Sequence, residues 1–297
     1  MTKRLGSFSA IFAVLVTLCG CLGVPQDAIR VGSYNIRLSP GDVGTPNAWD
    51  ERKADLVALV RKMDLDAFGM QEVCPDQAQY LREQLPEFAF VGDHREADRK
   101  SGEASPVFYR KSRFEAERRG TFWLSETPDV PASKSWNTAC TRVCSYLVLK
   151  DKVTGKRFCF ANTHTDHKSA EAREKGMLLI IERMKEFGKG APIVFTGDHN
   201  CHYGDAPAVA VRKVLKDGRD ISETRPSGPR NTFQGFGKYK DGPVDKNGKA
   251  YKDHCIDYIY VSDGTRVLDF TTHGDKRPGT DLYPSDHFPV TATIVLP

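Results

Sequence analysis

Short apolar segments of this chain repeatedly end in polar residues that can bind a metal ion or a phosphate. The pattern occurs at residues 33–35, 70–72, 162–164, 196–200 and 285–287. Strand ends are where α/β scaffolds present functional side chains. Core packing alone does not account for so many repeats of one arrangement. The sequence therefore predicts strands whose ends bring these polar side chains into a single cleft.

A sixth segment places a carboxylate inside an apolar run. Asp257 lies between Ile256 and the pair Tyr258 and Ile259. A carboxylate buried there needs a partner, because an unpaired buried charge is strongly unfavourable. His287 is the partner that we expect.

Taken singly, each of these residues also has a structural interpretation. Glu72 fits an exposed acid near a helix, Asn35 fits a turn, and His164 fits a histidine packed in the core. Asp198 fits a turn after a glycine, and the pair at 286–287 fits an exposed surface. Their joint occurrence in one chain favours a functional site.

The composition is that of a globular protein. Hydrophobic residues make up 39% of the 297 residues, charged residues make up 28%, and the mean hydropathy is −0.46. These values exclude a disordered chain, a collagen-like repeat and a polytopic membrane protein. The net charge of +4 argues against a general polyanion binder and leaves room only for a local basic groove.

The N-terminus has the pattern of a secretory signal. Lys3 and Arg4 precede a short apolar run that ends in Leu18-Cys19-Gly20-Cys21. The run is shorter than the roughly 20 residues that a transmembrane helix needs. The final tetrapeptide resembles a bacterial lipobox, which nominates Cys21 as the lipidated N-terminus of the mature chain. The alternative is an ordinary cleaved signal with incidental cysteines.

These features predict a signal peptide with lipobox at 1–20, a tether at 21–27 and one folded domain at 28–297. We expect an exported monomer, held by its lipid on the periplasmic or cell-surface side of a membrane.

Alternation and helical periodicity predict the elements of the domain. Strands are expected at 28–36, 66–71, 104–109, 114–123, 144–149, 157–163, 193–196, 256–261, 267–272 and 288–296. Helices are expected at 49–63, 75–85, 169–187 and 206–215, the third stopped by Gly188, and a long surface loop is expected at 227–252. Strands in both halves with helices between them favour two sheets packed face to face with helices outside.

The polar segments, in this order, are similar to the motifs of the endonuclease/exonuclease/phosphatase superfamily of metal-dependent phosphohydrolases. The resemblance spans roughly residues 30–296, and residues 107–110 and 122–128 further resemble a bacterial subgroup of small secreted members. It implies an α/β fold, a four-layer α/β sandwich in which two packed mixed β-sheets are flanked by helices.

The resemblance also implies hydrolysis of a phosphate ester by a metal-assisted water molecule. It assigns the metal site to Asn35, Glu72 and Asp286, whose oxygen ligands suit Mg²⁺ or Mn²⁺. It makes Asp198 the group that orients and deprotonates the water. No covalent nucleophile is expected.

The remaining catalytic residues implied by the resemblance would support the phosphoryl group. His164 and His287 would donate hydrogen bonds to its nonbridging oxygens, and Asn200 would hold a phosphoryl oxygen or Asp198. Asp257 would fix the tautomer of His287 and favour its charged form.

Two features depart from the family pattern. His199 stands before Asn200, where the family often has an apolar residue, and His and Cys are dense at 164–167, 199–202 and 254–255. Such ligands would suit Zn²⁺, which we rank below Mg²⁺ because histidines without a metal explain them as well. The six cysteines after the signal include no CxxC pair. Export permits disulfides, but no pairing is selected, and most of these thiols are expected to be buried.

The sequence does not identify which phosphate ester is the substrate. Acidic residues such as Glu96 and Glu115 interrupt the series of basic residues. This favours an exposed, hydrated surface over a surface that binds duplex nucleic acid. A nuclease, a phosphodiesterase and a phosphomonoesterase all remain, so nucleic acid stays a candidate substrate. Arg142, with Trp123 and Trp136 upstream, is a candidate for binding a phosphate or a ring. The alternatives are a sphingomyelinase-like lipid phosphodiesterase and a non-catalytic, ligand-binding surface lipoprotein.

Overall fold

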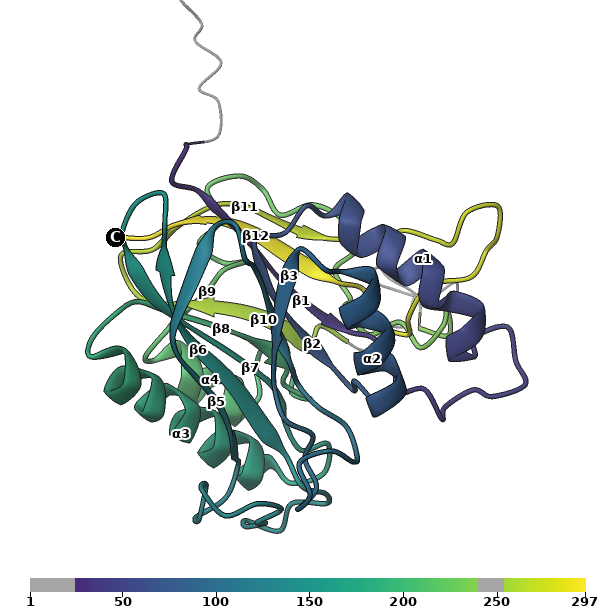
Figure 1. The fold of residues 1–297 in the computed structure, drawn as a ribbon, viewed down its shortest axis with the longest axis horizontal. Coiled ribbons are helices and arrows are strands. Elements are labelled where there is room, and N and C mark those ends of the chain that lie inside the picture. The colour runs from purple at the N-terminus through teal and green to yellow at the C-terminus, as the bar shows by residue number, and fades with distance from the viewer. Residues whose placement is uncertain (1–24, 240–253) are drawn as a thin grey trace, which may run out of the picture.

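Two six-stranded sheets lie face to face in the computed structural model, which describes residues 25–239 and 254–297 (Figure 1). The expected signal peptide, the lipobox with Cys21 and part of the loop expected at 227–252 lie outside these residues. Within the described part, no helix combines the length and the apolar composition that crossing a membrane requires.

Each sheet has a parallel pair of strands at its centre and antiparallel strands on either side. The first sheet has the order β11 (Arg266–Thr272), β12 (Val290–Val295), β1 (Ile29–Asn35), β2 (Ala67–Gln71), β4 (Val107–Arg110), β3 (Phe88–Val91). The second has the order β5 (Phe114–Trp123), β6 (Val143–Asp151), β7 (Arg157–His164), β8 (Ile193–Asp198), β10 (Asp257–Val261), β9 (Lys216–Asp217). The parallel pairs are β1 with β2 and β7 with β8.

Helices cover the outer face of each sheet. Helices α1 (Trp49–Lys62) and α2 (Pro75–Gln84) pack on the first sheet through one apolar cluster. Helices α3 (Ala170–Gly188) and α4 (Ala206–Arg212) pack on the second through another. A third cluster, with Val31, Phe160 and Val290 among its members, fills the space between the sheets. The four-layer α/β sandwich expected from the sequence is therefore confirmed (Figure 1).

The end of α3 differs from the expectation. Gly188 lies inside the helix, and Lys189, at φ 51°, is the left-handed residue that ends it. A Cβ on Gly188 would lie 2.3 Å from Cys159 Sγ. Glycine is thus needed there because the helix approaches β7 closely, and the prediction that Gly188 stops the helix is wrong.

Strands β3 and β9 have no counterpart among the expected elements, because both are short and neither has a clear alternation of apolar and polar residues. Cys74, Cys140, Cys144, Cys159 and Cys201 are free thiols, and all cysteines of the described residues except Cys140 are buried.

A buried asparagine joins the two sheets. Asn162 Nδ2 donates to the carbonyl oxygens of Met70 and Pro106 at 2.7 and 3.0 Å. Its Oδ1 accepts from Gln71 Nε2 at 2.7 Å. A Cβ on Gly69 would lie 2.1 Å from this Oδ1, so the glycine permits the approach. The bonds fix the relative position of β2 and β7 directly beneath one edge of the sandwich.

The strand ends that carry the polar segments of the sequence lie at this edge. The carboxyl ends of β1, β2, β7 and β8 lie there, together with the start of β10 and the segment before β12. The register places both His164 and Asp257 directly beside Asp198. Each sheet thus contributes part of one site.

Candidate active site

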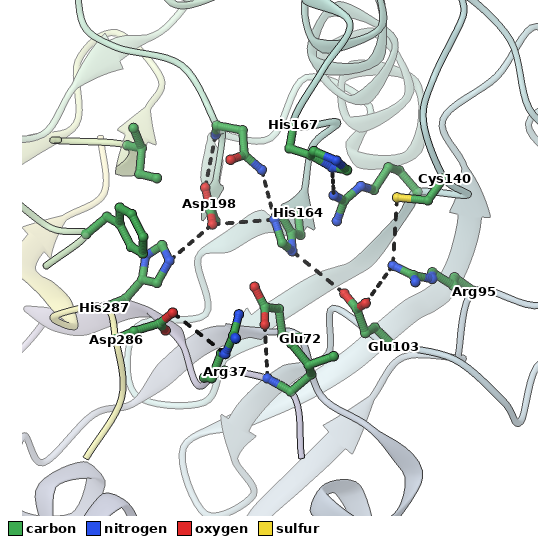
Figure 2. Close-up of a pocket in the computed structure, with 15 residues that line it drawn as sticks. Arg37, Glu72, Arg95, Glu103, Cys140, His164, His167, Asp198, Asp286 and His287 are labelled. Atoms are coloured by element: carbon green, nitrogen blue, oxygen red, sulfur yellow. Dashed lines mark hydrogen bonds and ion pairs between the residues drawn. The ribbon is translucent and has the colours of Figure 1, made fainter. Parts of the chain in front are cut away.

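A cavity of about 420 Å³ opens at this edge. Six of the eight predicted catalytic and metal-binding residues line it: Glu72, His164, Asp198, Asn200, Asp286 and His287 (Figure 2). Asn35 and Asp257 lie behind the cavity wall and reach it through hydrogen bonds to these residues. The structure therefore brings all eight predicted side chains together.

Asn35 connects two of the carboxylates. Its Nδ2 donates to Glu72 Oε1 at 3.1 Å and to Asp198 Oδ2 at 2.9 Å. Its Oδ1, which was expected to bind a metal, accepts a hydrogen bond from the Arg37 backbone at 3.0 Å. In this arrangement Asn35 orients Glu72 and Asp198.

Asp198 lies at the centre of the polar cluster and is only 2% exposed. Its Oδ1 accepts from the backbone N–H of Asn200 at 3.0 Å. Its Oδ2 lies 3.4 Å from His164 Nε2 and 3.6 Å from His287 Nε2. Burial, with repulsion from Asp257, raises the pKa of Asp198 to about 7, against the opposing effect of His287. A carboxylate with such a pKa can accept a proton near neutral pH.

His287 is held as a cation by Asp257. The two side chains share a hydrogen bond of 2.9 Å between His287 Nδ1 and Asp257 Oδ2. Burial favours the neutral imidazole, but the charge and hydrogen bond of Asp257 outweigh it and raise the pKa of His287 to about 10. His287 therefore offers an Nε2–H donor to the cavity.

His164 has the opposite character. Asn200 Nδ2 donates to His164 Nε2 at 2.9 Å, so the ring hydrogen lies on Nδ1. That nitrogen lies 3.9 Å from Glu103 Oε2. Burial, followed by the charges of Arg142 and His287, holds the pKa of His164 well below its usual value. The site thus contains one charged and one neutral histidine.

Three residues of the site have a left-handed backbone. Arg37, Glu72 and Asn200 have φ values of 58°, 62° and 47°. Each follows a central strand by one or two residues. This conformation is unfavourable for residues with a Cβ, and such strain tends to concentrate at functional sites.

The carboxylates suit a divalent cation. Glu72 and Asp286 line the same cavity, and Arg37 lies between them (Figure 2). Arg37 Nε is 3.8 Å from Asp286 Oδ2, so the carboxylates at this position already attract a positively charged group. Carboxylate oxygens are the ligands that Mg²⁺ and Mn²⁺ prefer. Glu72 and Asp286 are thus the residues that could hold such an ion. Asp198, Asp257 and His287 also offer ligand atoms within 4.8 Å of one another.

The cluster of Cys140, Asp166 and His167 is less suited to a metal. Asp166 Oδ1 accepts from the backbones of Lys168 and Ser169, while its Oδ2 accepts from Thr138 Oγ1 and the backbone of Ala139. With four donors on its two oxygens, this carboxylate is held by the loop, whereas Glu72 accepts only two hydrogen bonds, from Asn35 and the Leu38 backbone. His199 is also unsuited, because it is fully buried and its ring stacks against both Tyr258 and Tyr260.

The cavity also holds residues that the sequence analysis did not assign to the site. They include Arg37, Arg95, Glu103, Cys140 and His167. Arg95, Glu103 and Cys140 lie in irregular segments that do not directly follow an apolar strand, so no sequence pattern identifies them. Arg142 lines the cavity as expected, whereas its proposed companions Trp123 and Trp136 do not.

Comparison with known proteins agrees with this geometry. The sequence profile described as the Endonuclease/Exonuclease/phosphatase family matches residues 32–287. A protein of that family from Bacteroides thetaiotaomicron has 34% identity and a TM-score of 0.82, over 91% of this chain and 95% of that one. A mannosyl-6-phosphatase from the same organism has 33% identity and a TM-score of 0.81, over 90% and 100% of the two chains.

Curated relatives are more distant and longer. Nocturnin from Drosophila melanogaster is 22% identical over 92% of this chain, which spans only 47% of that protein. The chain spans 30% of an uncharacterized protein from Acanthamoeba polyphaga mimivirus, with 24% identity over 59% of its own length. The family profile, which matches most of the chain, agrees with the fold and with the residues around the cavity. The chain therefore belongs to the endonuclease/exonuclease/phosphatase family.

Proposed function

We propose that this protein hydrolyses phosphate monoesters of small soluble molecules, such as sugar phosphates, with the help of Mg²⁺ or Mn²⁺. Family membership supports a metal-dependent phosphoesterase. The observation that carries the proposal is Asp198, a buried carboxylate with a pKa of about 7 that lies between two histidines at the cavity floor.

The residues of the site have distinct tasks in this reaction. Asp198 accepts a proton from the attacking water, and Asn35 and Asn200 hold its two oxygens in place. His287 donates its Nε2 hydrogen to a nonbridging phosphoryl oxygen, and Asp257 keeps it charged. A divalent cation held by Glu72 and Asp286 would stabilise negative charge on the phosphoryl group and the leaving oxygen.

The size of the site and one comparison favour a small substrate. A cavity of about 420 Å³ suits a small molecule, and a similar structure is described as a mannosyl-6-phosphatase. Several arginines outside the cavity are paired with acids, for example Arg99 with Asp93 and Arg110 with Asp64, and so do not form a free basic face. A nucleic acid is therefore less well supported.

A screen of the purified domain tests the proposal. After chelation, p-nitrophenyl phosphate, bis-p-nitrophenyl phosphate, hexose phosphates, inositol phosphates, RNA and single- and double-stranded DNA are offered with Mg²⁺, Mn²⁺ or Zn²⁺. We expect turnover of monoesters with Mg²⁺ or Mn²⁺ and none in Asp198→Ala. The matched control is Asp217→Ala, which removes a buried aspartate that does not line the cavity. Preferred hydrolysis of DNA, RNA or the diester would refute the substrate class. A rate unchanged in Asp198→Ala would refute the site.

The location of the protein is a separate proposal that rests on the sequence alone. We expect lipid attachment at Cys21 on the exported protein. Labelling of expressing bacteria with radioactive palmitate should mark the wild-type protein and not Cys21→Ser.

A further inference from the structure

Three arginines line the active-site cavity, and two of them are neutralised by acids. Arg37 Nε lies 2.9 Å from Asp42 Oδ2. Arg95 Nη1 lies 2.9 Å from Glu103 Oε1. Arg142 has no carboxylate within ion-pair distance among the residues that the structure describes. The cavity therefore contains one guanidinium that no carboxylate pairs directly, although its charge still acts on Glu103 from a longer distance.

The burial of Arg142 makes this lack of a direct ion pair significant. The residue is only 6% exposed, and its Nε has no hydrogen-bond partner. Its side-chain contact is a hydrogen bond of 3.3 Å from Nη2 to His167 Nδ1. A guanidinium carries five donors, and a buried charge without a partner is costly. An anion that enters through the cavity would supply the missing partner.

The position of Arg142 separates this anion from the phosphoryl group under attack. His164 lies between His287 on one side and His167 on the other (Figure 2). The water-activating Asp198 contacts His164 and His287, whereas Arg142 contacts His167. The charge of Arg142 also acts on His164, but its hydrogen bond is to His167, on the side of His164 away from His287. From there Arg142 would reach the part of a bound ester that lies beyond the scissile phosphoryl group.

A cation is a poor candidate for the same place. Arg142 repels it, and both oxygens of the neighbouring Asp166 are already occupied by donors of the loop. His167 accepts a hydrogen bond at Nδ1, which leaves its hydrogen at Nε2 as a further donor. The donors at this end of the cavity match an anion.

We propose that Arg142, positioned by His167, forms a second anion subsite and that the preferred ester carries a phosphate or a carboxylate on its leaving group. This inference rests on the proposed function and names the substrate class within it. A sugar bisphosphate and a phosphorylated sugar acid are the two sources of such an anion.

Inhibition constants in a matched series test the subsite without requiring turnover of the series. Glucose 6-phosphate, glucose 1,6-bisphosphate and 6-phosphogluconate share the C6 phosphate and differ at C1. Each is tested as an inhibitor of p-nitrophenyl phosphate hydrolysis. In the wild type, a second anion should tighten inhibition roughly 10- to 100-fold, as a charge-assisted hydrogen bond to a buried group would. The tighter-binding of the two probes that carry a second anionic group identifies phosphate or carboxylate.

Variants assign the effect to Arg142. In Arg142→Gln, probes with and without the second anion should inhibit about equally, so the ratio of their inhibition constants should fall to about one. Arg142→Lys should retain part of the wild-type ratio. The matched control is Arg118→Gln, which removes the same charge from β5 outside the cavity and should keep the wild-type ratio. Thermal unfolding verifies that each variant is folded.

The outcomes separate this inference from the proposed function. Equal inhibition by all three probes in the wild type, or an undiminished ratio in Arg142→Gln, overturns the subsite. An equal loss for all three in Arg142→Gln also overturns it, because Arg142 would then hold the scissile phosphoryl group while the hydrolase stands. If the wild type hydrolyses no ester, the proposed function fails. Calorimetric binding of 6-phosphogluconate to wild type and Arg142→Gln then decides the subsite separately.

Discussion

Asp257 Oδ2 lies 2.9 Å from His287 Nδ1, and both side chains are almost completely removed from solvent. Asp257 begins β10 in one sheet, whereas His287 lies three residues before the start of β12, at Val290, in the other. The pair therefore joins the two sheets at the floor of the cavity. It fixes the ring so that Nε2 points toward Asp198, 3.6 Å away.

Asp257→Asn should abolish most of the activity. The amide cannot balance the imidazolium charge, so His287 loses both its orientation and its proton. We expect kcat for p-nitrophenyl phosphate to fall by roughly 10²- to 10⁴-fold. Asp217→Asn is the control, because Asp217 is equally buried on the adjoining strand β9 but does not line the cavity. Similar losses in both variants would show that a buried aspartate matters only for folding.

The rate should rise with pH through neutrality. Asp198 must be deprotonated to accept a proton, and burial raises its pKa to about 7. His287 must be protonated to donate, and its pKa is raised to about 10. At saturating Mg²⁺, kcat/KM should increase about tenfold per pH unit below about pH 7, level off, and decline near pH 10. A profile that is flat between pH 5 and pH 8 would contradict the assignment of the base.

His199→Phe should make stability less sensitive to acid. Neither ring nitrogen of His199 has a partner, and burial lowers its pKa to about 3. Between about pH 6.5 and pH 3 the unfolded chain therefore binds a proton that the native state does not bind, and the free energy of unfolding falls as the pH falls. In the variant, the slope of the free energy of unfolding against pH should be smaller by up to about 1.4 kcal/mol per pH unit. Urea unfolding at several pH values measures it, and parallel curves for wild type and variant would disprove it.

Asn162→Ala should weaken the junction between the sheets. It leaves the carbonyls of Met70 and Pro106 buried without their donor. We expect the free energy of unfolding to fall by roughly 2–5 kcal/mol. Gln79→Ala, on the exposed face of α2, should change it by less than about 0.5 kcal/mol. A small effect at Asn162 would mean that water replaces the amide.

Three of the predicted residues that line the cavity share one property. Glu72, His164 and Asp198 each end or follow an apolar strand whose alternation is local, and a local pattern can be recognised without the fold. The central parallel pairs then carry these strand ends to one edge. Both the layers and the grouping of the site were therefore predictable.

The remaining features depend on tertiary contacts. Glu103 joins the site because Arg95 and His164 flank it, and nothing in its own segment indicates this. The amide of Asn35 turns its nitrogen toward the carboxylates because the left-handed Arg37 presents a backbone N–H to its oxygen. Likewise, Gly188 could be distinguished from a helix stop only by its contact with Cys159.

Because each sheet supplies only some of the groups around the cavity, neither sheet alone contains a complete reaction centre. Partly folded forms with a single sheet would bind and turn over nothing. Recovery of enzyme activity after dilution from denaturant would thus report the docking of the two sheets, an event that spectroscopic signals of secondary structure would miss.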